Sequence, residues 1–188
     1  DETDVEMSWV DINNTQAGVL ATRHLIQRGY RRIAFVSESG STTFDADRVS
    51  GYCRELAAKG LPVGSEMIIH TGAGIENAIR EVNDLLTGEN RPDAVLCGSD
   101  IIALGAVRAA RRIGLGIPDD FGVLSFDNTA ITALAEPGIT SMDVDTYELG
   151  VQTAEILINQ IENPEASIRH VLLSTRVVER ESTRRHLE

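Results

Sequence analysis

Four polar side chains that can bind a small molecule lie shortly after apolar runs in this sequence. Ser99 and Asp100 follow one such run, Asp127 follows another, and Arg48 lies a short loop after a third. A carboxylate can accept hydrogen bonds from two neighbouring hydroxyls or from the edge of a base, and a guanidinium can bind a hydroxyl pair, a carboxylate or a carbonyl. The alternative interpretation is that Asp100 and Asp127 cap helices or turns and that Arg48 is a solvated helix residue.

No enzyme motif accompanies these residues. The sequence contains no G-x-G-x-x-G after a predicted strand, no phosphate-binding P-loop and no G-x-S-x-G nucleophile motif. The histidines are scattered, and the two cysteines, Cys53 and Cys97, show no metal-ligand spacing. The sequence therefore predicts a protein that is not an enzyme and holds no cofactor and no metal. The two thiols are predicted to be buried and reduced.

The elements that must position the polar residues alternate between strand and helix. Short apolar runs are separated by helix-like stretches of ten or more residues, which predicts an α/β fold with a doubly wound, mostly parallel sheet. Ligands of such sheets bind at the carboxyl ends of the strands. The loops expected there are 37–47, 71–74, 98–100 and 127–129. Strands are predicted near 9–12, 33–36, 67–69, 93–97, 122–126, 141–144, 170–173 and 176–178, and helices near 14–28, 45–59, 75–86, 100–113, 130–135 and 147–161.

The composition limits the partners of the chain. It has 188 residues, a net charge of −12, 42% hydrophobic residues and 24% charged residues, as in soluble globular proteins. No apolar run approaches the length of a membrane span. Phosphate binding needs clustered Lys and Arg, so the acidic balance argues against nucleic-acid binding by this chain itself.

Several short motifs follow one another in order along most of the chain. They include Val10-Asp-Ile-Asn-Asn14, Gly29-Tyr-Arg-Arg-Ile-Ala-Phe35, Asp47-Arg48-Val-Ser-Gly51, Ser99-Asp100-Ile-Ile-Ala-Leu-Gly105, Val123-Leu-Ser-Phe-Asp127, Pro137-Gly-Ile-Thr140 and Arg180-Glu-Ser-Thr183. In this order they resemble the effector-binding domain of the LacI/GalR family of bacterial transcription regulators. Each motif alone is weak, and the ordered series is specific.

The resemblance implies a periplasmic-binding-protein-like fold of two lobes with the effector between them. We expect a partial N-terminal lobe from residues 1–37 and 143–162, and a complete C-terminal lobe from 38–142 and 163–183. The chain would cross between the lobes near 38–42, 143–145 and 163–167. Residues 184–188 are expected to be a tail that includes vector residues. The chain is expected to be a fragment whose helix-turn-helix headpiece is missing.

The same resemblance assigns residues to the effector site. Arg48 and Asp127 match family positions that contact effector hydroxyls or carboxylates. Ser99 stands where the family usually has Asn, and Ala73 stands where characterised members often have an aromatic ring. Phe44 is expected to supply the apolar face instead, or else to act as a hydrophobic staple for the following helix. The candidate effector-binding set is Arg48, Asp127, Ser99, Asp100, Phe44, Thr42 and Ala73.

The predicted function is effector sensing and dimerisation in a cytoplasmic LacI-type regulator. The small-molecule effector is expected to be a sugar or a sugar derivative. Operator DNA would be bound only by the missing headpiece, and no membrane is involved. A homodimer is expected through helices 75–86 and 103–111. One alternative is a periplasmic sugar-binding protein of an ABC transporter, which has the same two-lobed fold. An α/β enzyme would need a nucleophile or base that the sequence does not reveal.

Overall fold

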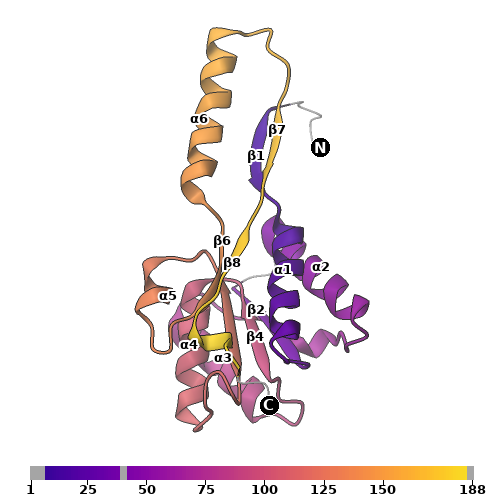
Figure 1. The fold of residues 1–188 in the computed structure, drawn as a ribbon, viewed down its shortest axis with the longest axis vertical. Coiled ribbons are helices and arrows are strands. Elements are labelled where there is room, and N and C mark those ends of the chain that lie inside the picture. Colours follow the sequence, from indigo (N-terminus) through magenta and orange to yellow (C-terminus); the bar gives the residue numbers. More distant parts are fainter. Residues whose placement is uncertain (1–6, 39–41, 186–188) are drawn as a thin grey trace.

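The computed structural model describes residues 7–38 and 42–185. Its main body is a six-stranded sheet in the order β3-β2-β4-β5-β6-β8, and a second sheet pairs β1 with β7 (Figure 1). The strands are β1 Trp9–Ile12, β2 Ile33–Ser37, β3 Ile68–His70, β4 Ala94–Cys97, β5 Gly122–Phe126, β6 Thr140–Asp143, β7 His170–Leu173 and β8 Arg176–Val178. The longer helices are α1 Asn14–Gln27, α2 Thr43–Ala58, α3 Ile75–Thr87, α4 Asp100–Arg112, α5 Ala130–Leu134 and α6 Thr146–Glu162. This confirms the predicted α/β fold.

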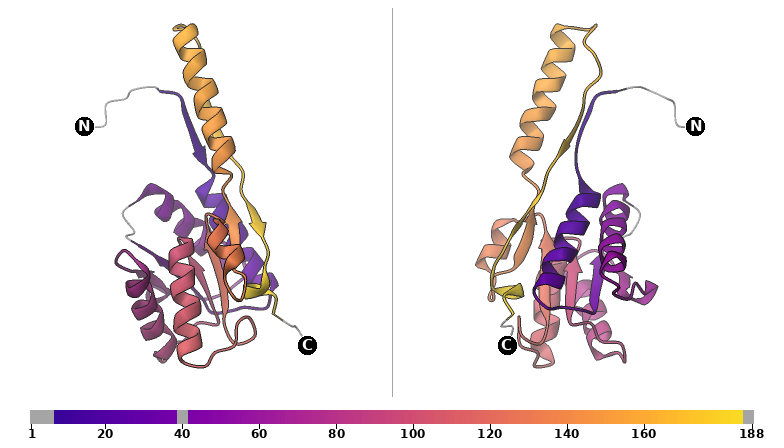
Figure 2. Two further views of the ribbon diagram at one scale, coloured as in Figure 1. Left: turned by 90° about the vertical axis from the view of Figure 1, so that its left-hand side faces the viewer. Right: turned by 45° about the vertical axis from the view of Figure 1, so that its right-hand side comes forward.

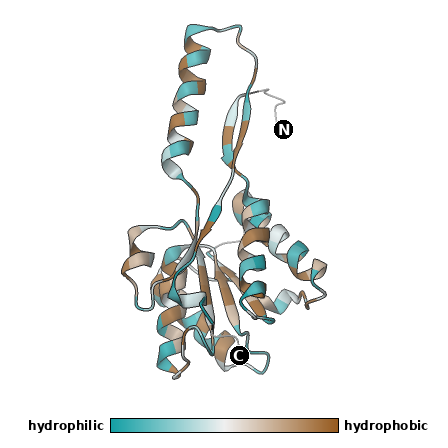
Figure 3. Cartoon of the chain, viewed as in Figure 1, coloured by the Kyte–Doolittle hydropathy of each residue, from teal (hydrophilic) through white to brown (hydrophobic). Residues whose placement is uncertain are grey.

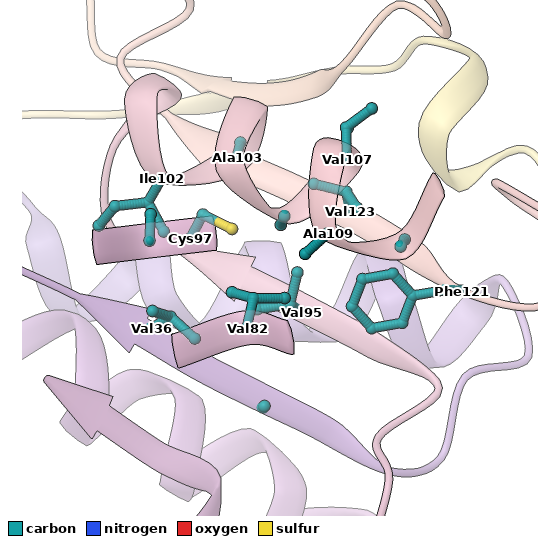
Figure 4. Packing of buried hydrophobic residues seen from close by; sticks show 14 of the residues in the cluster. Val36, Val82, Val95, Cys97, Ile102, Ala103, Val107, Ala109, Phe121 and Val123 are labelled. Carbon is teal, nitrogen blue, oxygen red and sulfur yellow. The ribbon is translucent and has the colours of Figure 1, made fainter. Parts of the chain in front are cut away.

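The three central strands are buried along their whole length because helices cover both faces of the sheet. Every residue of β2, β4 and β5 is buried, as expected for parallel strands with two covered faces. Helices α3 and α4 pack on one face, where Figure 4 shows Val36, Val95 and Val123 of the strands in one cluster with Val82 and Ile102 of the helices. Helices α1 and α2 pack on the opposite face. Only β8 runs antiparallel, at the edge of the sheet.

Helices α1 and α2 approach each other closely at two glycines. A Cβ atom built on Gly18 of α1 would lie 2.2 Å from the carbonyl oxygen of Arg48, and one on Gly51 of α2 would lie 2.1 Å from the carbonyl oxygen of Thr15. Only glycine permits this spacing, since real Cβ atoms do not come so near to backbone atoms. The close crossing brings the first turn of α1 next to the first turns of α2.

A slender extension projects from the main body. It consists of β1, β7 and α6, and Figure 2 shows it standing clear of the six-stranded sheet in two further views. Ile156 is the only buried residue of α6, while Leu157, Ile158 and Ile161 are exposed. Figure 3 shows apolar residues along this helix. None of the helices in residues 7–38 and 42–185 has the length and apolar character needed to cross a bilayer.

The predicted lobe boundaries differ from the observed arrangement. Residues 1–37 were expected in the smaller lobe, but β2 pairs with β3 and β4 in the large sheet and α1 packs on that sheet. Likewise β7 was expected in the large lobe and pairs with β1 in the extension. A short apolar strand can have the same sequence pattern in either lobe, so its pairing partner cannot be read from its own residues.

The chain passes between the main body and the extension three times, and two of these connections lie at other places than predicted. They lie between β1 and α1, between β6 and α6, and between β7 and β8. The connection predicted near 143–145 is the one that coincides. Of the predicted tail, residues 186–188 lie outside the described part of the chain.

Candidate functional site

A cavity of about 340 Å³ lies where the carboxyl ends of β1, β2, β4 and β5 meet. Its volume is within the range of small-molecule sites, near the lower end. The wall combines charged, polar and apolar side chains from the main body and from the base of the extension. The lining residues are Asp11, Ile12, Asn14, Glu38, Thr42, Phe44, Asp45, Arg48, Gly98, Ser99, Ile102 and Asp127.

Arg48 is the central cation of this wall. Its side chain is held in place by two hydrogen bonds: Nε donates to Oδ1 of Asn14 at 2.9 Å, and Nη1 donates to the carbonyl oxygen of Gly98 at 3.1 Å. The guanidinium carbon lies 4.2 Å from the centre of the Phe126 ring. Arg48 and Asn14 are both buried, so the glycine-mediated crossing of α1 and α2 sets the position of the guanidinium.

Burial and nearby carboxylates act on Arg48 in opposite directions. Burial lowers the pKa of the guanidinium, while the charges of Asp127, Asp45 and Asp11 raise it. Arginine retains its charge at neutral pH in proteins, because its ordinary pKa is so high. The site therefore presents a fixed positive charge surrounded by negative ones.

Asp127 faces the cavity from the end of β5. Its backbone has φ = 95°, a conformation that L-residues rarely adopt, and its N–H donates to the carbonyl oxygen of Met142 at 3.1 Å. Burial raises the pKa of the carboxyl; Arg48 opposes that shift, and Asp100 and Asp45 add to it. Backbone strain of this kind concentrates at functional sites, which makes Asp127 a strong candidate for ligand contact.

Asp100, in contrast, does not line the cavity. Its carboxylate is buried and accepts hydrogen bonds from the Ser125 hydroxyl at 2.6 Å and from the Thr129 N–H and hydroxyl at 2.8 and 2.7 Å. It thereby ties the start of α4 to the loop after β5. Asp100 was predicted to contact the effector, but it is not among the residues that line the cavity, and its hydrogen bonds hold the loop that follows Asp127.

The other predicted site residues also divide into those that line the cavity and one that does not. Thr42, Phe44 and Ser99 line the cavity, whereas Ala73 lies exposed in the loop after β3 and does not. Ser99 also caps α4, since its hydroxyl accepts the N–H of Ile102 at 3.5 Å. The hydroxyl oxygen of Thr42 is buried and has no hydrogen-bond partner among residues 7–38 and 42–185. Ala73 is remote because β3 is the edge strand of the sheet.

Sequence reasoning missed a further set of lining residues. Glu38 and Asp45 lie within the loop 37–47, which was predicted to lie at the carboxyl ends of the strands, but neither was predicted to contact a ligand. Asp11 lies near the end of the predicted strand 9–12 and Asn14 follows it, so the rule that ligands bind at carboxyl strand ends would have included both. That signal was overlooked because their strand belongs to the separate two-stranded sheet. The full missed set is Asp11, Ile12, Asn14, Glu38, Asp45, Gly98 and Ile102.

Groups associated with metal or thiol chemistry are not gathered at this site. Within the described ranges, no cluster of His, Cys, Asp and Glu has the arrangement to hold a metal ion. Cys97 is buried in β4, and Cys53 is only partly buried, so the prediction of two buried thiols is correct for Cys97 alone. Burial raises the pKa of both thiols. The side chains of the cavity wall can bind a ligand through hydrogen bonds and charge interactions.

A parallel sheet with a polar cavity at its carboxyl ends, bordered by a second small sheet, defines a ligand-binding domain of the periplasmic-binding-protein type. Residues 22–183 match the family model described as a periplasmic binding protein-like domain. The chain belongs to this family, and its relatives are transcription regulators of the LacI family.

Three relatives illustrate the match. Catabolite control protein A of Priestia megaterium is 31% identical over 97% of this chain and 55% of its own length. The ribose operon repressor of Haemophilus influenzae is 31% identical over 90% of this chain and 51% of its own length. A solved complex of the transcriptional regulator CelR with cellobiose superposes with a TM-score of 0.88 at 29% identity, covering 96% of this chain and 55% of that one. The chain thus spans about half the length of these relatives.

Proposed function

We propose that this chain is the effector-sensing part of a LacI-type transcription regulator and that a sugar or sugar derivative is its effector. The cavity built around Arg48 and Asp127 is the observation that carries the proposal. It lies between the main body and the extension, so a ligand there contacts both. A relative that represses a ribose operon and a regulator solved with cellobiose support a carbohydrate as the ligand class.

The ligand would act by favouring one angle between body and extension. A ligand shifts a conformational equilibrium only by as much as its affinity differs between the two states. Contacts to Asp11 on the extension and to Arg48 on the main body supply that difference, since their separation changes with the angle. In a dimeric regulator, such a change alters the spacing of two DNA-binding headpieces on the operator.

The regulator is proposed to be a cytoplasmic homodimer that holds operator DNA through a headpiece outside this chain. A groove between α3, α4 and α5 supports a dimer surface, because it combines Ile75, Leu104 and Val107 with nearby arginines. Leu134 is 82% exposed at the end of α5, next to Ala135 of this groove. Replacing Leu134 with Ser is expected to weaken the dimer in sedimentation experiments, and an unchanged dimer would contradict this surface.

A thermal-shift screen of sugars and nucleobases on the full-length regulator tests the effector proposal. A bound ligand raises the melting temperature in a concentration-dependent manner, because it stabilises only the folded state. The variant Asp127→Ala is expected to melt as a folded protein but to lose the shift. An unchanged effector titration in that variant would refute the assignment of the cavity.

A further inference from the structure

We propose that the cavity selects a polyhydroxylated ligand that carries a positive charge, such as an amino sugar, over its neutral and anionic counterparts. This proposal deepens the proposed function, because it concerns the same site and rests on a small polyol binding there. It follows from the balance and arrangement of charges around the cavity.

Negative charges outnumber positive ones in the cavity wall. Its described part contains four carboxylates, those of Asp11, Glu38, Asp45 and Asp127, and a single guanidinium, that of Arg48. One carboxylate compensates the guanidinium, and the other three have no cationic counterpart in the wall. A neutral polyol can donate hydrogen bonds to these carboxylates, but it leaves their excess negative charge uncompensated.

The one cation already donates two of its hydrogen bonds to the protein, which leaves the rest of its donors for a ligand. Arg48 donates to Asn14 and to the carbonyl of Gly98, and its planar group lies over the ring of Phe126. Asp45 is beside the same strand end: a Cβ atom built on Gly98 would lie 3.5 Å from Oδ1 of Asp45. Arg48 thus organises the ends of α1 and β4, and a ligand phosphate or carboxylate would meet Asp45 close to the guanidinium.

The wall carboxylates differ in exposure: Asp11 and Glu38 are exposed to solvent, whereas Asp45 is shielded from it. Asp45 is only 5% exposed. Asp127 responds to its surroundings, since burial together with Asp100 and Asp45 raises its pKa against the effect of Arg48. A ligand ammonium would lower this mutual repulsion and can donate three hydrogen bonds to the carboxylates. A ligand anion would increase the repulsion.

The neutral part of the ligand has its own contacts. The buried hydroxyl of Thr42, which lacks a partner in the described part of the chain, and the hydroxyl of Ser99 can exchange hydrogen bonds with ligand hydroxyls. Phe44 is 43% exposed and offers an apolar face to a sugar ring. A polyol with one amine therefore matches both halves of the wall.

The test uses titration calorimetry on the full-length regulator with matched ligands: glucose, galactose and ribose, each as the neutral sugar, as amino-deoxy derivatives with the amine at different positions, and as the phosphate ester. For a parent sugar that binds, at least one amino derivative should bind roughly tenfold tighter, and the phosphate ester roughly tenfold weaker, because of one partly screened charge contact. The advantage of the amine should shrink as salt is added.

Charge-neutralising variants identify the source of the preference. Glu38→Gln, at an exposed residue, should reduce the affinity ratio of amine to neutral sugar by several-fold, and Asp45→Asn should reduce it further. Glu162→Gln at the end of α6 removes the same charge far from the cavity and should leave the ratio unchanged.

The outcomes separate the two proposals. If a neutral sugar binds with dependence on Asp127 but amines gain nothing, or if the phosphate ester binds most tightly, the charge selection is wrong and the effector site stands. If no polyol of any charge binds, both proposals fail.

Discussion

Replacing Gly51 with Ala tests whether the close crossing of α1 and α2 sets the site. The added Cβ atom would lie 2.1 Å from the carbonyl oxygen of Thr15, and ordinary contacts begin at 3.4 Å, so the helices must separate by about 1.3 Å. Overpacking of this kind costs about 1–3 kcal/mol, and a backbone obstacle that cannot rotate away places the cost near the upper end. Alanine in a helix returns about 1 kcal/mol relative to glycine. The expected net loss of stability is about 2 kcal/mol.

The same substitution should also disturb the ligand-binding cavity. The bond from Arg48 to Asn14 joins the two helices at 2.9 Å, and separation by about 1.3 Å would exceed hydrogen-bonding distance. Ligand affinity should therefore fall together with stability. Urea denaturation followed by circular dichroism measures the stability change, with an unchanged slope showing that the transition itself is comparable.

Gly150 supplies a matched control. It lies inside α6, and a Cβ atom built on it has nothing within 4 Å. The same substitution there is expected to leave stability unchanged or to raise it by about 0.5–1 kcal/mol. If Gly51→Ala were as stable as the unmodified protein, the inference that backbone contact fixes the helix spacing would be refuted.

Three further predictions concern the cavity wall and the loop that follows β5. Burial raises the folded-state pKa of the Asp127 carboxyl above its usual 3.8. The contribution of this group to the free energy of unfolding is therefore complete below pH 3.8 and is lost as the pH rises through the raised pKa. Asp127→Asn should stabilise the protein at pH 7 but not at pH 3, as measured by urea denaturation. Phe44→Ala removes a ring whose centre lies 5.1 Å from the guanidinium carbon of Arg48 and should cost about 0.5–1 kcal/mol of stability, with a larger loss in ligand affinity by calorimetry. Asn128 has φ = 52° and accepts a hydrogen bond from Nη2 of Arg180 at 2.8 Å. Both Asn128→Gly and Asn128→Ala remove that hydrogen bond. The Asn128→Ala variant should be less stable than the Asn128→Gly variant by about 1 kcal/mol, because alanine is strained at positive φ.

The fold could be predicted from local sequence because each element carries its own signal. Asn13 caps α1 by accepting the N–H of Gln16 at 3.0 Å, and Gly29 follows the helix with φ = 88°. The apolar runs predicted to be strands at 33–36, 93–97 and 122–126 form β2, β4 and β5. These features depend on nearby residues only, so a reading of the sequence finds them.

The partition of the elements and part of the site could not be predicted in the same way. β7 and β8 are separated by two residues and join different sheets, which depends on distant partners rather than on local pattern. Asp100 and Asp127 both follow buried strands, and only the three-dimensional structure shows that the first is consumed by Ser125 and Thr129 while the second faces the cavity. Ala73 was placed by family position, and its loop leaves an edge strand that ends away from the cavity.

The central claim is that a small polyol binds in the cavity between the main body and the extension. A crystal structure of the full-length regulator with a ligand from the thermal-shift screen tests it most directly. Electron density for the ligand is expected within hydrogen-bonding distance of Asp127, near Arg48 and against Phe44. Density for the ligand at any other place, with this cavity filled by the protein's own side chains, would contradict it.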